Sequence, residues 1–353
     1  MGVGQRRLKA EWEEQCAILM SFPHARSDWS QCLEEARACF IHIIECILGF
    51  ESVLLCVDTQ DSEGQKILLQ HFGARARLWQ EGITRAEIKS RRELFILSVA
   101  VNDTWARDFG AISIEEAGEG KLLDFVFNGW GLKFAANFDN QITQSVLSRL
   151  YPHIERVGLV LEGGSIESNG NGALLTNTQC LLEPNRNPHL SQAQIESKLR
   201  ECFGLELVHW LTQGYLAGDD TDSHIDTLAR FIAPDTIAYI ACDDEGDEHY
   251  SALRAMEEEL RALKQANGEG YKLVRLPFTR AIYDEAGQRL PASYANFLFV
   301  NGALLVPTYE DSNDEVALAI LREALPKIQV LGVPCSTLIV WHGSLHCVTM
   351  QLY

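Results

Sequence analysis

The stretch GSIESNGNGALLT, residues 164–176, contains two short apolar segments separated by a turn rich in Asn and Gly. This arrangement is typical of a β-hairpin, because Asn and Gly accept the backbone angles that tight turns require. Three other stretches have the same organisation: RDFGAISIEEAGEGKLLDFVF (107–127), HIDTLARFIAPDTIAYIA (224–241) and SYANFLFVNGALLVPTY (293–309). We therefore expect a fold built from repeated strand pairs.

Helical segments alternate with these strand pairs. The candidates are residues 31–48, 140–151, 192–203, 249–266 and 314–325. Two of them begin with a capping box, Ser191 with Gln194 and Ser312 with Glu315. In a capping box the two side chains satisfy backbone N–H groups that the first helical turn leaves free. The alternation predicts an α/β fold.

Four polar motifs recur along the chain: NDTWARD (102–108), LEGGS (161–165), DDTDSHID (219–226) and LHC (345–347). Asp108, Glu162, His224, Tyr294 and Cys347 follow one another at intervals of 54, 62, 70 and 53 residues. A repeat of roughly 50–70 residues, built as strand, turn, strand and helix, indicates a quasi-symmetric ring of modules, four of which begin at Asp108, Glu162, His224 and Tyr294. A fifth module can close the ring by pairing HCVTMQLY (346–353) with CAILMSFP (16–23). A doubly wound sheet is the alternative architecture, but no GxGxxG motif follows a strand.

The length allows two domains or one large α/β domain, and we expect a single soluble domain covering residues 1–353. Of the 353 residues, 46% are hydrophobic and 22% are charged, as in ordinary globular proteins. The formal net charge of −19 would repel phosphates, which argues against nucleic acid as a partner. The same charge would attract small cations toward an acidic cleft.

The chain shows no targeting or membrane signal. The N-terminal sequence MGVGQRRLKAEWEE lacks the apolar region of a secretory signal, and Arg6 stands where N-myristoylation needs Ser or Thr. The longest apolar run, residues 39–50, is too short to span a bilayer. Ten cysteines without a CxxC pair favour reduced thiols. We expect a cytoplasmic protein with no membrane partner, and the sequence leaves a homo-oligomer open.

Cys347 is a candidate nucleophile. It lies in WHGSLHCVTMQLY (341–353), where we expect it just inside a strand that follows a Gly-containing loop. An inert core thiol is the alternative interpretation. His342 and His346 lie nearby in the sequence, and a nearby positive charge turns a thiol into a useful nucleophile by lowering its pKa.

His224 and Asp226 are candidates for proton transfer and cation binding. They are two residues apart, so on a strand their side chains would share one face. A solvated turn is the alternative. The nearby Asp219, Asp220 and Asp222 look like metal ligands, but they lack the alternation and the later Glu of a calcium loop. Since no HExxH or paired Cys/His spacing is present either, we expect no metal site.

Asp108 and Glu162 add two further carboxylates. Gly163 and Gly164 follow Glu162, so that the backbone can pass close to a ligand. Several converging acids are costly to bury unless they are paired with a cation. A planar guanidinium suits them, because carboxylates accept its N–H groups in pairs.

These residues and motifs resemble those of the guanidine-modifying enzymes with the pentein (α/β-propeller) fold, and within them the agmatine deiminases. The resemblance covers nearly the whole chain, through residues 10–23, 102–110, 161–182, 186–188, 218–231, 291–297 and 342–351. It implies that Cys347 is the nucleophile and His224 the general acid/base. It also implies that Asp108, Glu162 and Asp226 bind the substrate, with Trp105 nearby. The chain departs from the family at its end, where HGSLHCVTMQ stands in place of GGNIHCITQQ.

The resemblance implies the hydrolysis of agmatine to N-carbamoylputrescine and ammonia through a covalent amidino-cysteine, without a cofactor. The expected partner is a small cationic guanidino compound, and Asp220 is our candidate contact for its distal ammonium. Deimination of free or peptidyl arginine would use the same chemistry. A metal-dependent hydrolase and a non-catalytic binding ring are further alternatives.

Overall fold

Each predicted strand pair forms an antiparallel hairpin, and a third strand joins the second strand of the hairpin in parallel. The computed structural model describes residues 6–353, so our interpretation of residues 1–5 as free of a targeting signal lies outside the described range. At residues 164–176, β9 (Ile166–Ser168) pairs with β10 (Ala173–Asn177), and β11 (Leu207–Leu211) follows. Gly170 and Gly172 turn the hairpin with φ angles of 69° and 82°, a left-handed conformation that favours glycine.

Three more sheets repeat this order of an antiparallel pair followed by a parallel strand. Their strands are β12 (Ala229–Ala233), β13 (Thr236–Ala241) and β14 (Lys272–Pro277); β15 (Leu298–Val300), β16 (Ala303–Thr308) and β17 (Gln329–Pro334); and β6 (Ile112–Glu116), β7 (Glu119–Val126) and β8 (Ile154–Val160). In the last sheet β1 (Arg6–Leu8) adds to the free edge of β6.

The fifth sheet joins the two ends of the described chain. As predicted, β18 (Met350–Leu352) pairs antiparallel with β2 (Ala17–Ser21), with Met350 opposite Leu19. The sheet continues in parallel through β3 (Ser52–Val57), β5 (Leu94–Ser98) and β4 (Ala76–Leu78). This pairing brings the segment that carries Cys347 next to residues from the start of the chain.

Four of the five predicted helices are present. They are α1 (Leu33–Leu48), α8 (Gln192–Phe203), α9 (Tyr250–Ala262) and α10 (Asp314–Ala324). The helix predicted at 140–151 is wrong: the segment forms α6 (Ile142–Ser145) between two 3-10 turns, η3 (Asp139–Gln141) and η4 (Leu147–Arg149). Its side chains bind the neighbouring β7 region instead, since Asn140 accepts a hydrogen bond from the Phe127 N–H at 2.8 Å.

The two predicted capping boxes have different outcomes. Ser191 and Gln194 form theirs. Ser312 does not, because α10 begins later, with Asn313 as its N-cap, and the Asp314 carboxylate accepts the N–H of Asp311 at 3.0 Å. A box that the sequence analysis missed, Thr84 with Glu87, starts α3 (Arg85–Arg91). Also unpredicted are α2 (Ser62–Phe72) and the short helices α4 (Ala106–Phe109), α5 (Gly129–Leu132), α7 (Thr178–Leu181) and α11 (Ser336–Ile339).

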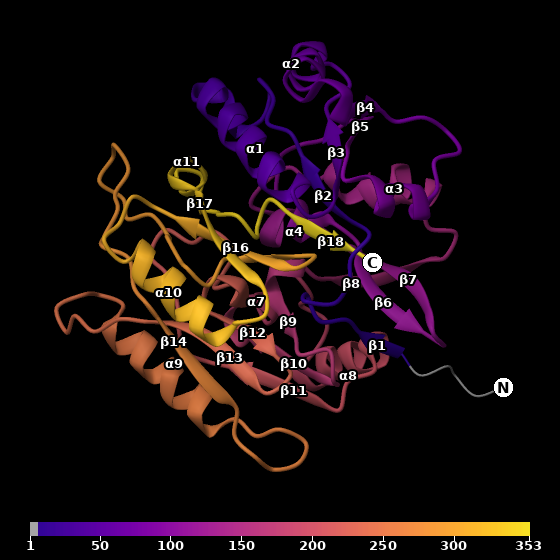
Figure 1. Cartoon of the computed structure of the whole chain (residues 1–353). Helices are drawn as coiled ribbons and strands as arrows, with labels where there is room; N and C mark the ends of the chain where they lie inside the picture. The colour runs from indigo at the N-terminus through magenta and orange to yellow at the C-terminus, as the bar shows by residue number, and fades with distance from the viewer. Residues whose placement is uncertain (1–5) are drawn as a thin grey trace.

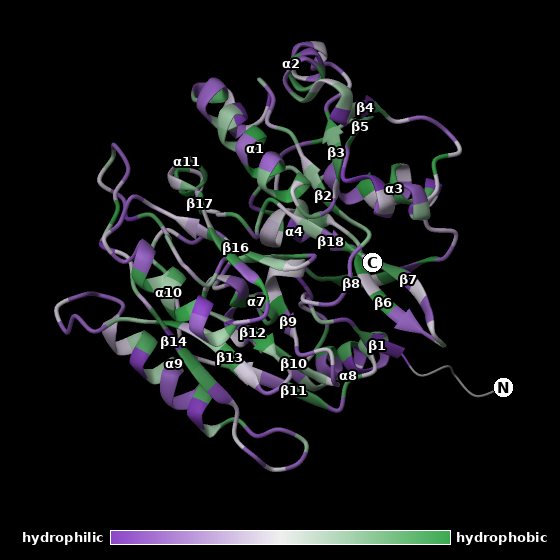
Figure 2. Cartoon of the chain, in the orientation of Figure 1, coloured by the Kyte–Doolittle hydropathy of each residue, from purple (hydrophilic) through white to green (hydrophobic). Residues whose placement is uncertain are grey.

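The longer helices α1, α2, α9 and α10 lie around the outside of the molecule, and the sheets converge toward its centre (Figure 1). In α1, Ala36, Phe40, Ile43, Ile44 and Ile47 form one fully buried stripe at helical spacing. Each fully buried Phe or Ile of such a stripe contributes roughly 1.5–3 kcal/mol relative to an exposed one. The outer helices accordingly alternate polar and apolar colours along their length, whereas the inner strands are mostly apolar (Figure 2).

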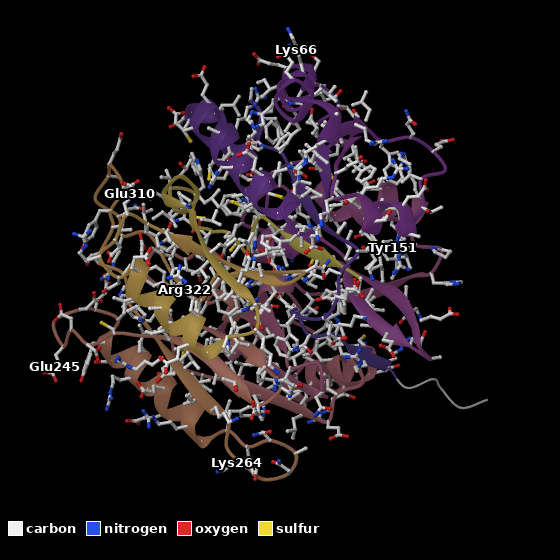
Figure 3. The ribbon with its side chains drawn as sticks, in the orientation of Figure 1. Lys66, Tyr151, Glu245, Lys264, Glu310 and Arg322 are labelled. Atoms are coloured by element: carbon white, nitrogen blue, oxygen red, sulfur yellow. The ribbon has the colours of Figure 1, made fainter. Side chains whose placement is uncertain are left out.

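Charged side chains such as Lys66, Glu245 and Lys264 extend from the periphery of the molecule (Figure 3). Within residues 6–353, no helix combines the length and the apolar character that crossing a membrane requires.

Candidate active site

A cavity of about 400 Å³ brings together residues that lie far apart in the sequence. Asp108, His224, Asp226 and Cys347 line its inner part, and Trp105 forms part of its wall. Asp108 belongs to α4, and Asp226 belongs to the 3-10 turn η6 (Ile225–Thr227), which His224 caps. The structure thus brings four of the five predicted catalytic residues into one cavity.

Cys347 lies in the turn before β18, three residues before the strand begins at Met350, so its predicted position inside a strand is wrong. Its Sγ atom lies 3.5 Å from Oδ1 of Asn296 and 3.9 Å from Oδ2 of Asp226. Burial, followed by the negative charges of Asp226 and Asp108, raises the pKa of the thiol well above its usual value. The free protein therefore holds Cys347 as a neutral thiol at pH 7.

Asp226 is fully buried and presents its two carboxylate oxygens in different directions. Oδ2 accepts a hydrogen bond from Nδ1 of His346 at 2.8 Å, and Oδ1 has no hydrogen-bond partner within residues 6–353. Burial alone would raise the pKa of Asp226, but the bond and charge of His346 lower it below the usual value. The predicted strand at this position is wrong, because Asp226 lies in η6 and its carboxylate binds His346 rather than His224.

His224 is 1% exposed and lies beside Asp108, with 3.6 Å between Nδ1 of His224 and Oδ1 of Asp108. Its Nε2 atom has no hydrogen-bond partner in the described part of the chain. Burial lowers the pKa of His224 to about 3, against the opposing charge of Asp226. The imidazole is therefore neutral in the free protein and can accept a proton.

Asp108 is held by two donors. Nε1 of Trp130 donates to Oδ2 at 2.9 Å, and the backbone N–H of Gly164 donates to Oδ1 at 3.0 Å. Trp130 adopts a left-handed backbone with φ 53° and ψ 53°, which is uncommon for a side chain of this size. Burial and the neighbouring Asp226 charge raise the pKa of Asp108 well above its usual value. The free site thus disfavours a second negative charge beside Asp226.

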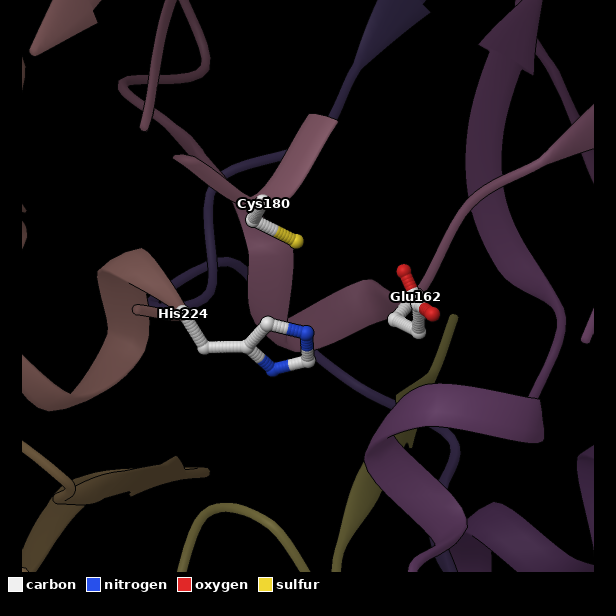
Figure 4. Close-up of side chains that lie close together, drawn as sticks. All are labelled: Glu162, Cys180 and His224. Carbon is white, nitrogen blue, oxygen red and sulfur yellow. The ribbon is translucent and has the colours of Figure 1, made fainter. Parts of the chain in front are cut away.

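Glu162 lies behind His224 and does not line the cavity. Both of its carboxylate oxygens accept hydrogen bonds from Nε of Arg186, at 2.9 and 3.0 Å, and the residue is fully buried. Glu162 is thus paired with Arg186 outside the cavity lining, and its expected contact with the substrate stays a prediction. The His224 ring points toward Glu162, with the buried Cys180 beside them (Figure 4).

Two groups of side chains have the residue types of a metal site. Possible ligand atoms of Glu162, Cys180 and His224 lie within 4.8 Å of one another, as do those of Glu11, Glu167 and His346. In each group a guanidinium already binds the carboxylates: Arg186 binds Glu162, and Arg230 binds Glu11 and Glu167. A metal ion would have to displace an arginine that already balances the negative charge.

Glycines allow the close approach of these groups. A Cβ atom on Gly164 would lie 2.6 Å from Nδ1 of His224 and 2.9 Å from Oδ1 of Asp108. A Cβ atom on Gly343 would lie 2.2 Å from Cζ3 of Trp105. Gly164, one of the two glycines expected to let the backbone approach a ligand, therefore makes room for His224 and Asp108.

The mouth of the cavity is acidic. Asp220 lines it and is partly exposed, and Nε2 of His342 lies 4.0 Å from Oδ2 of Asp220. His342 also contacts the Gly218 carbonyl through Nδ1 at 2.6 Å. Asp222 faces away from the cavity, toward Lys133 at 2.8 Å and Arg186 at 2.7 Å. Asp219 accepts hydrogen bonds within its own loop, including one from the Ser223 N–H at 2.6 Å.

Four residues that contact the site side chains had no such contact predicted from the sequence: Trp130, Arg186, Asn296 and His346. Asn296 and Arg186 lay inside the quoted stretches 291–297 and 186–188, but no spacing linked them to Cys347 or Glu162. His346 was treated as a neighbour of Cys347 in the sequence. Its contact with Asp226 depends on how the two loops meet in the fold.

The model of the Porphyromonas-type peptidyl-arginine deiminase family matches residues 7–352. The chain belongs to this family. Among its relatives is an agmatine deiminase of Pseudomonas aeruginosa, which is 34% identical over 98% of this chain and 95% of the relative. The agmatine deiminase of Ectopseudomonas mendocina is 32% identical over 98% and 94% of the two chains.

A solved structure of the C. jejuni agmatine deiminase with substrate bound has a TM-score of 0.87 with this chain, at 39% identity, and covers 99% of this chain and 96% of its own. An amidinotransferase from Microseira wollei is similar in fold alone, with a TM-score of 0.51 at 11% identity over 99% and 97% of the two chains. The mixed α/β fold is thus shared with deiminases and with an amidinotransferase.

Proposed function

We propose that this protein is an agmatine deiminase, a hydrolase that converts agmatine and water to N-carbamoylputrescine and ammonia. One observation carries the proposal: a thiol, a neutral imidazole and two carboxylates line one cavity, and Oδ1 of Asp226 accepts no hydrogen bond from residues 6–353. A guanidinium supplies both the positive charge and the N–H donors that this arrangement lacks. The agmatine deiminase relatives support the same substrate.

Binding of a guanidinium changes the ionisation of the site. The pKa values of Cys347 and Asp108 are raised by burial and by the Asp226 charge, so a cation placed between these groups lowers both. Asp108 then becomes a second carboxylate for the substrate, and the Cys347 thiol can transfer its proton to His224. The substrate itself thereby activates the nucleophile.

The chemistry then follows in two halves. The Cys347 sulfur attacks the central guanidinium carbon, and the proton held on His224 moves to one nitrogen, which leaves as ammonia. His224 then removes a proton from a water molecule, and the water oxygen attacks the central carbon of the remaining amidino-thioether. The carbon–sulfur bond breaks as His224 returns its proton to the Cys347 sulfur, and the ureido product forms when the hydroxyl proton leaves and converts the released ammonia to ammonium. We infer that Glu162 orients His224 from behind, while Arg186 balances the Glu162 charge.

We also infer that the five sheets form a five-module ring with pseudo-fivefold symmetry and act as one catalytic domain. Each sheet contains an antiparallel pair followed by a parallel strand, including the sheet built from both ends of the described chain. The likeness in fold to an amidinotransferase supports this architecture. In such a ring, loops from successive modules meet at the axis, which accounts for a site made of distant segments.

The far end of the cavity favours agmatine over arginine. Asp220 offers a carboxylate to a terminal ammonium, and Trp105 offers an apolar surface to the methylene chain. Arg26 also lines the cavity, but it is paired with Asp58. An α-carboxylate would therefore meet negative charge at the mouth. Peptidyl arginine remains the second candidate, because the matching family model is described as a peptidyl-arginine deiminase.

The proposal is tested by ammonia release from agmatine, free arginine and a peptide with a C-terminal arginine. We expect turnover of agmatine, and Cys347→Ser should bind agmatine but release no ammonia. Cys39→Ser serves as the control, because Cys39 lies in α1 outside the cavity. Turnover of the peptide alone would replace agmatine with a peptidyl substrate, and full activity of Cys347→Ser would remove the covalent mechanism.

A further inference from the structure

Behind Asp226 lies a buried network of charged side chains that the proposed chemistry does not use. Its centre is His346, which is fully buried and lies between Asp226 and Glu11. Glu11 comes from the segment between β1 and β2, and His346 precedes Cys347 in the sequence. The network therefore links the start of the chain to the catalytic end.

Both ring nitrogens of His346 contact a carboxylate. Nδ1 lies 2.8 Å from Oδ2 of Asp226, and Nε2 lies 2.7 Å from Oε1 of Glu11. Contacts this short need a proton between nitrogen and oxygen. A ring with a single N–H would leave one of the two contacts as a repulsion between lone pairs. The three groups therefore hold two protons between them.

Charges around His346 act in both directions. Burial and the cations Arg107 and Arg230 hold the pKa of His346 below its usual value, although Glu11 and Asp226 oppose this. Arg230 lies 3.1 Å from Nε2 of His346 and also binds Glu11. The pKa of Glu11 is itself held well below its usual value, against the effect of burial, by Arg230 and His346. When both acids are ionised, each of the two short contacts needs its own proton, and this geometry favours an imidazolium despite the lowered pKa of His346.

The backbone fixes the direction of this ring. The N–H of His346 donates to Oδ1 of Asn296 at 2.9 Å, and Nδ1 contacts Oδ2 of Asp226, which leaves Oδ1 of Asp226 without a partner in residues 6–353. Glu11 lines a second, smaller cavity of about 50 Å³, and Asp226 lines the main one. Glu11 therefore borders a cavity that shares no lining residue with the main one.

We propose that Glu11 and His346 form a positioning dyad that keeps Asp226 ionised and aims its free oxygen at the guanidinium of the substrate. The inference rests on the proposed function for the identity of the substrate. The dyad touches no reacting atom; it acts through Asp226. It explains how a fully buried carboxylate remains ionised before a cation binds.

The test compares His346→Asn and Glu11→Gln with the unchanged protein. The Asn amide can replace Nδ1 toward Asp226 but carries no charge and does not reach Glu11. For both variants we expect KM for agmatine to rise at least about tenfold. We also expect the acidic limb of the pH profile of kcat/KM to move to higher pH by about one unit, because Asp226 then protonates more easily.

His249→Asn is the matched control. His249 is also a buried histidine bound to a carboxylate, with Nδ1 lying 2.8 Å from Oδ1 of Asp247, and it lies at the start of α9 outside the main cavity. We expect it to lose stability and to keep the acidic limb unchanged. If His346→Asn and Glu11→Gln also lose stability or kcat without moving the limb, the network is merely structural and the proposal is overturned.

A second measurement needs no substrate. In the unchanged protein with ¹⁵N-labelled histidine, NMR should show His346 protonated at both nitrogens near pH 7, and Glu11→Gln should leave one N–H. A singly protonated His346 in the unchanged protein would overturn the proposal, even if a variant fails to fold. Failure to hydrolyse agmatine with a doubly protonated His346 would instead contradict the proposed function and retain the dyad.

Discussion

Nδ1 of His224 lies 3.6 Å from Oδ1 of Asp108, and the backbone of Gly164 packs against both side chains. Gly164, which has no side chain, thus places both His224, the proposed proton acceptor, and Asp108, a carboxylate proposed to bind the substrate. The N–H of Gly164 also donates to the same Asp108 oxygen at 3.0 Å. Small changes at this position should therefore act directly on catalysis.

Gly164→Ala tests this close packing. The added methyl group would lie 2.6 Å from Nδ1 of His224, so the imidazole or Asp108 must move. Displacement by about 1 Å is enough to cost roughly a hundredfold in kcat, and we expect a loss of at least that size. Gly158→Ala is the control, because no atom lies within 4 Å of its added Cβ. Near-normal turnover by Gly164→Ala would mean that the geometry around His224 is not critical.

Trp130→Phe tests the hydrogen bond to Asp108. The substitution keeps an aromatic ring and removes the N–H that lies 2.9 Å from Oδ2 of Asp108. Since hydrogen bonds to charged groups contribute about 1.5–3 kcal/mol, we expect kcat/KM for agmatine to fall at least tenfold. Trp79→Phe is the matched control, because the Trp79 N–H has no hydrogen-bond partner in residues 6–353. Equal effects of the two substitutions in steady-state kinetics would contradict a role for this bond.

Asp220→Asn tests the recognition of the distal ammonium. The unchanged protein should prefer agmatine to arginine by at least about a hundredfold in kcat/KM, a difference of about 3 kcal/mol. Loss of the Asp220 charge should weaken agmatine use and narrow that gap. The control is Asp222→Asn: its carboxylate binds Lys133 and Arg186 instead of lining the cavity, so it should affect stability more than selectivity. Equal use of agmatine and arginine by the unchanged protein would contradict the assignment of agmatine.

Exhaustive chelation tests whether a metal takes part. We expect ammonia release to survive EDTA, because Arg186 and Arg230 already pair with the carboxylates in the two groups that have metal-ligand residue types. The remaining acids of the cavity are assigned to the guanidinium of the substrate. Loss of activity with EDTA and recovery with a divalent ion would favour a metal-dependent hydrolase.

The sequence predicted the strand pairs and the pairing of the chain ends because these depend on local patterns of apolar and turn residues. Cys347, His224, Asp226 and Asp108 were selected by residue type and line one cavity, while their roles stay predictions. The hydrogen-bond partner of each side chain was harder to predict from the sequence. Glu162 was expected at the substrate, but Arg186, twenty-four positions later in the chain, binds both of its oxygens.

Contacts between distant loops explain the remaining differences. The carboxylate of Asp226 turns toward His346 because η6 replaces the expected strand and changes the direction of the side chain. Glu11 lies 335 positions from His346 in the sequence, and no local pattern connects them. Contacts such as the one between Glu11 and His346 depend on how the modules are arranged in space, and the spacing of residues in the sequence predicts that arrangement only coarsely.

The covalent intermediate on Cys347 is the central claim of this account. Mass spectrometry of protein quenched during agmatine turnover measures it directly. We predict an amidino adduct on the peptide that contains Cys347, absent before agmatine is added and absent in Cys347→Ser. Ammonia release without any adduct under conditions that preserve thioethers, or an adduct on the buried Cys180 instead, would contradict the account.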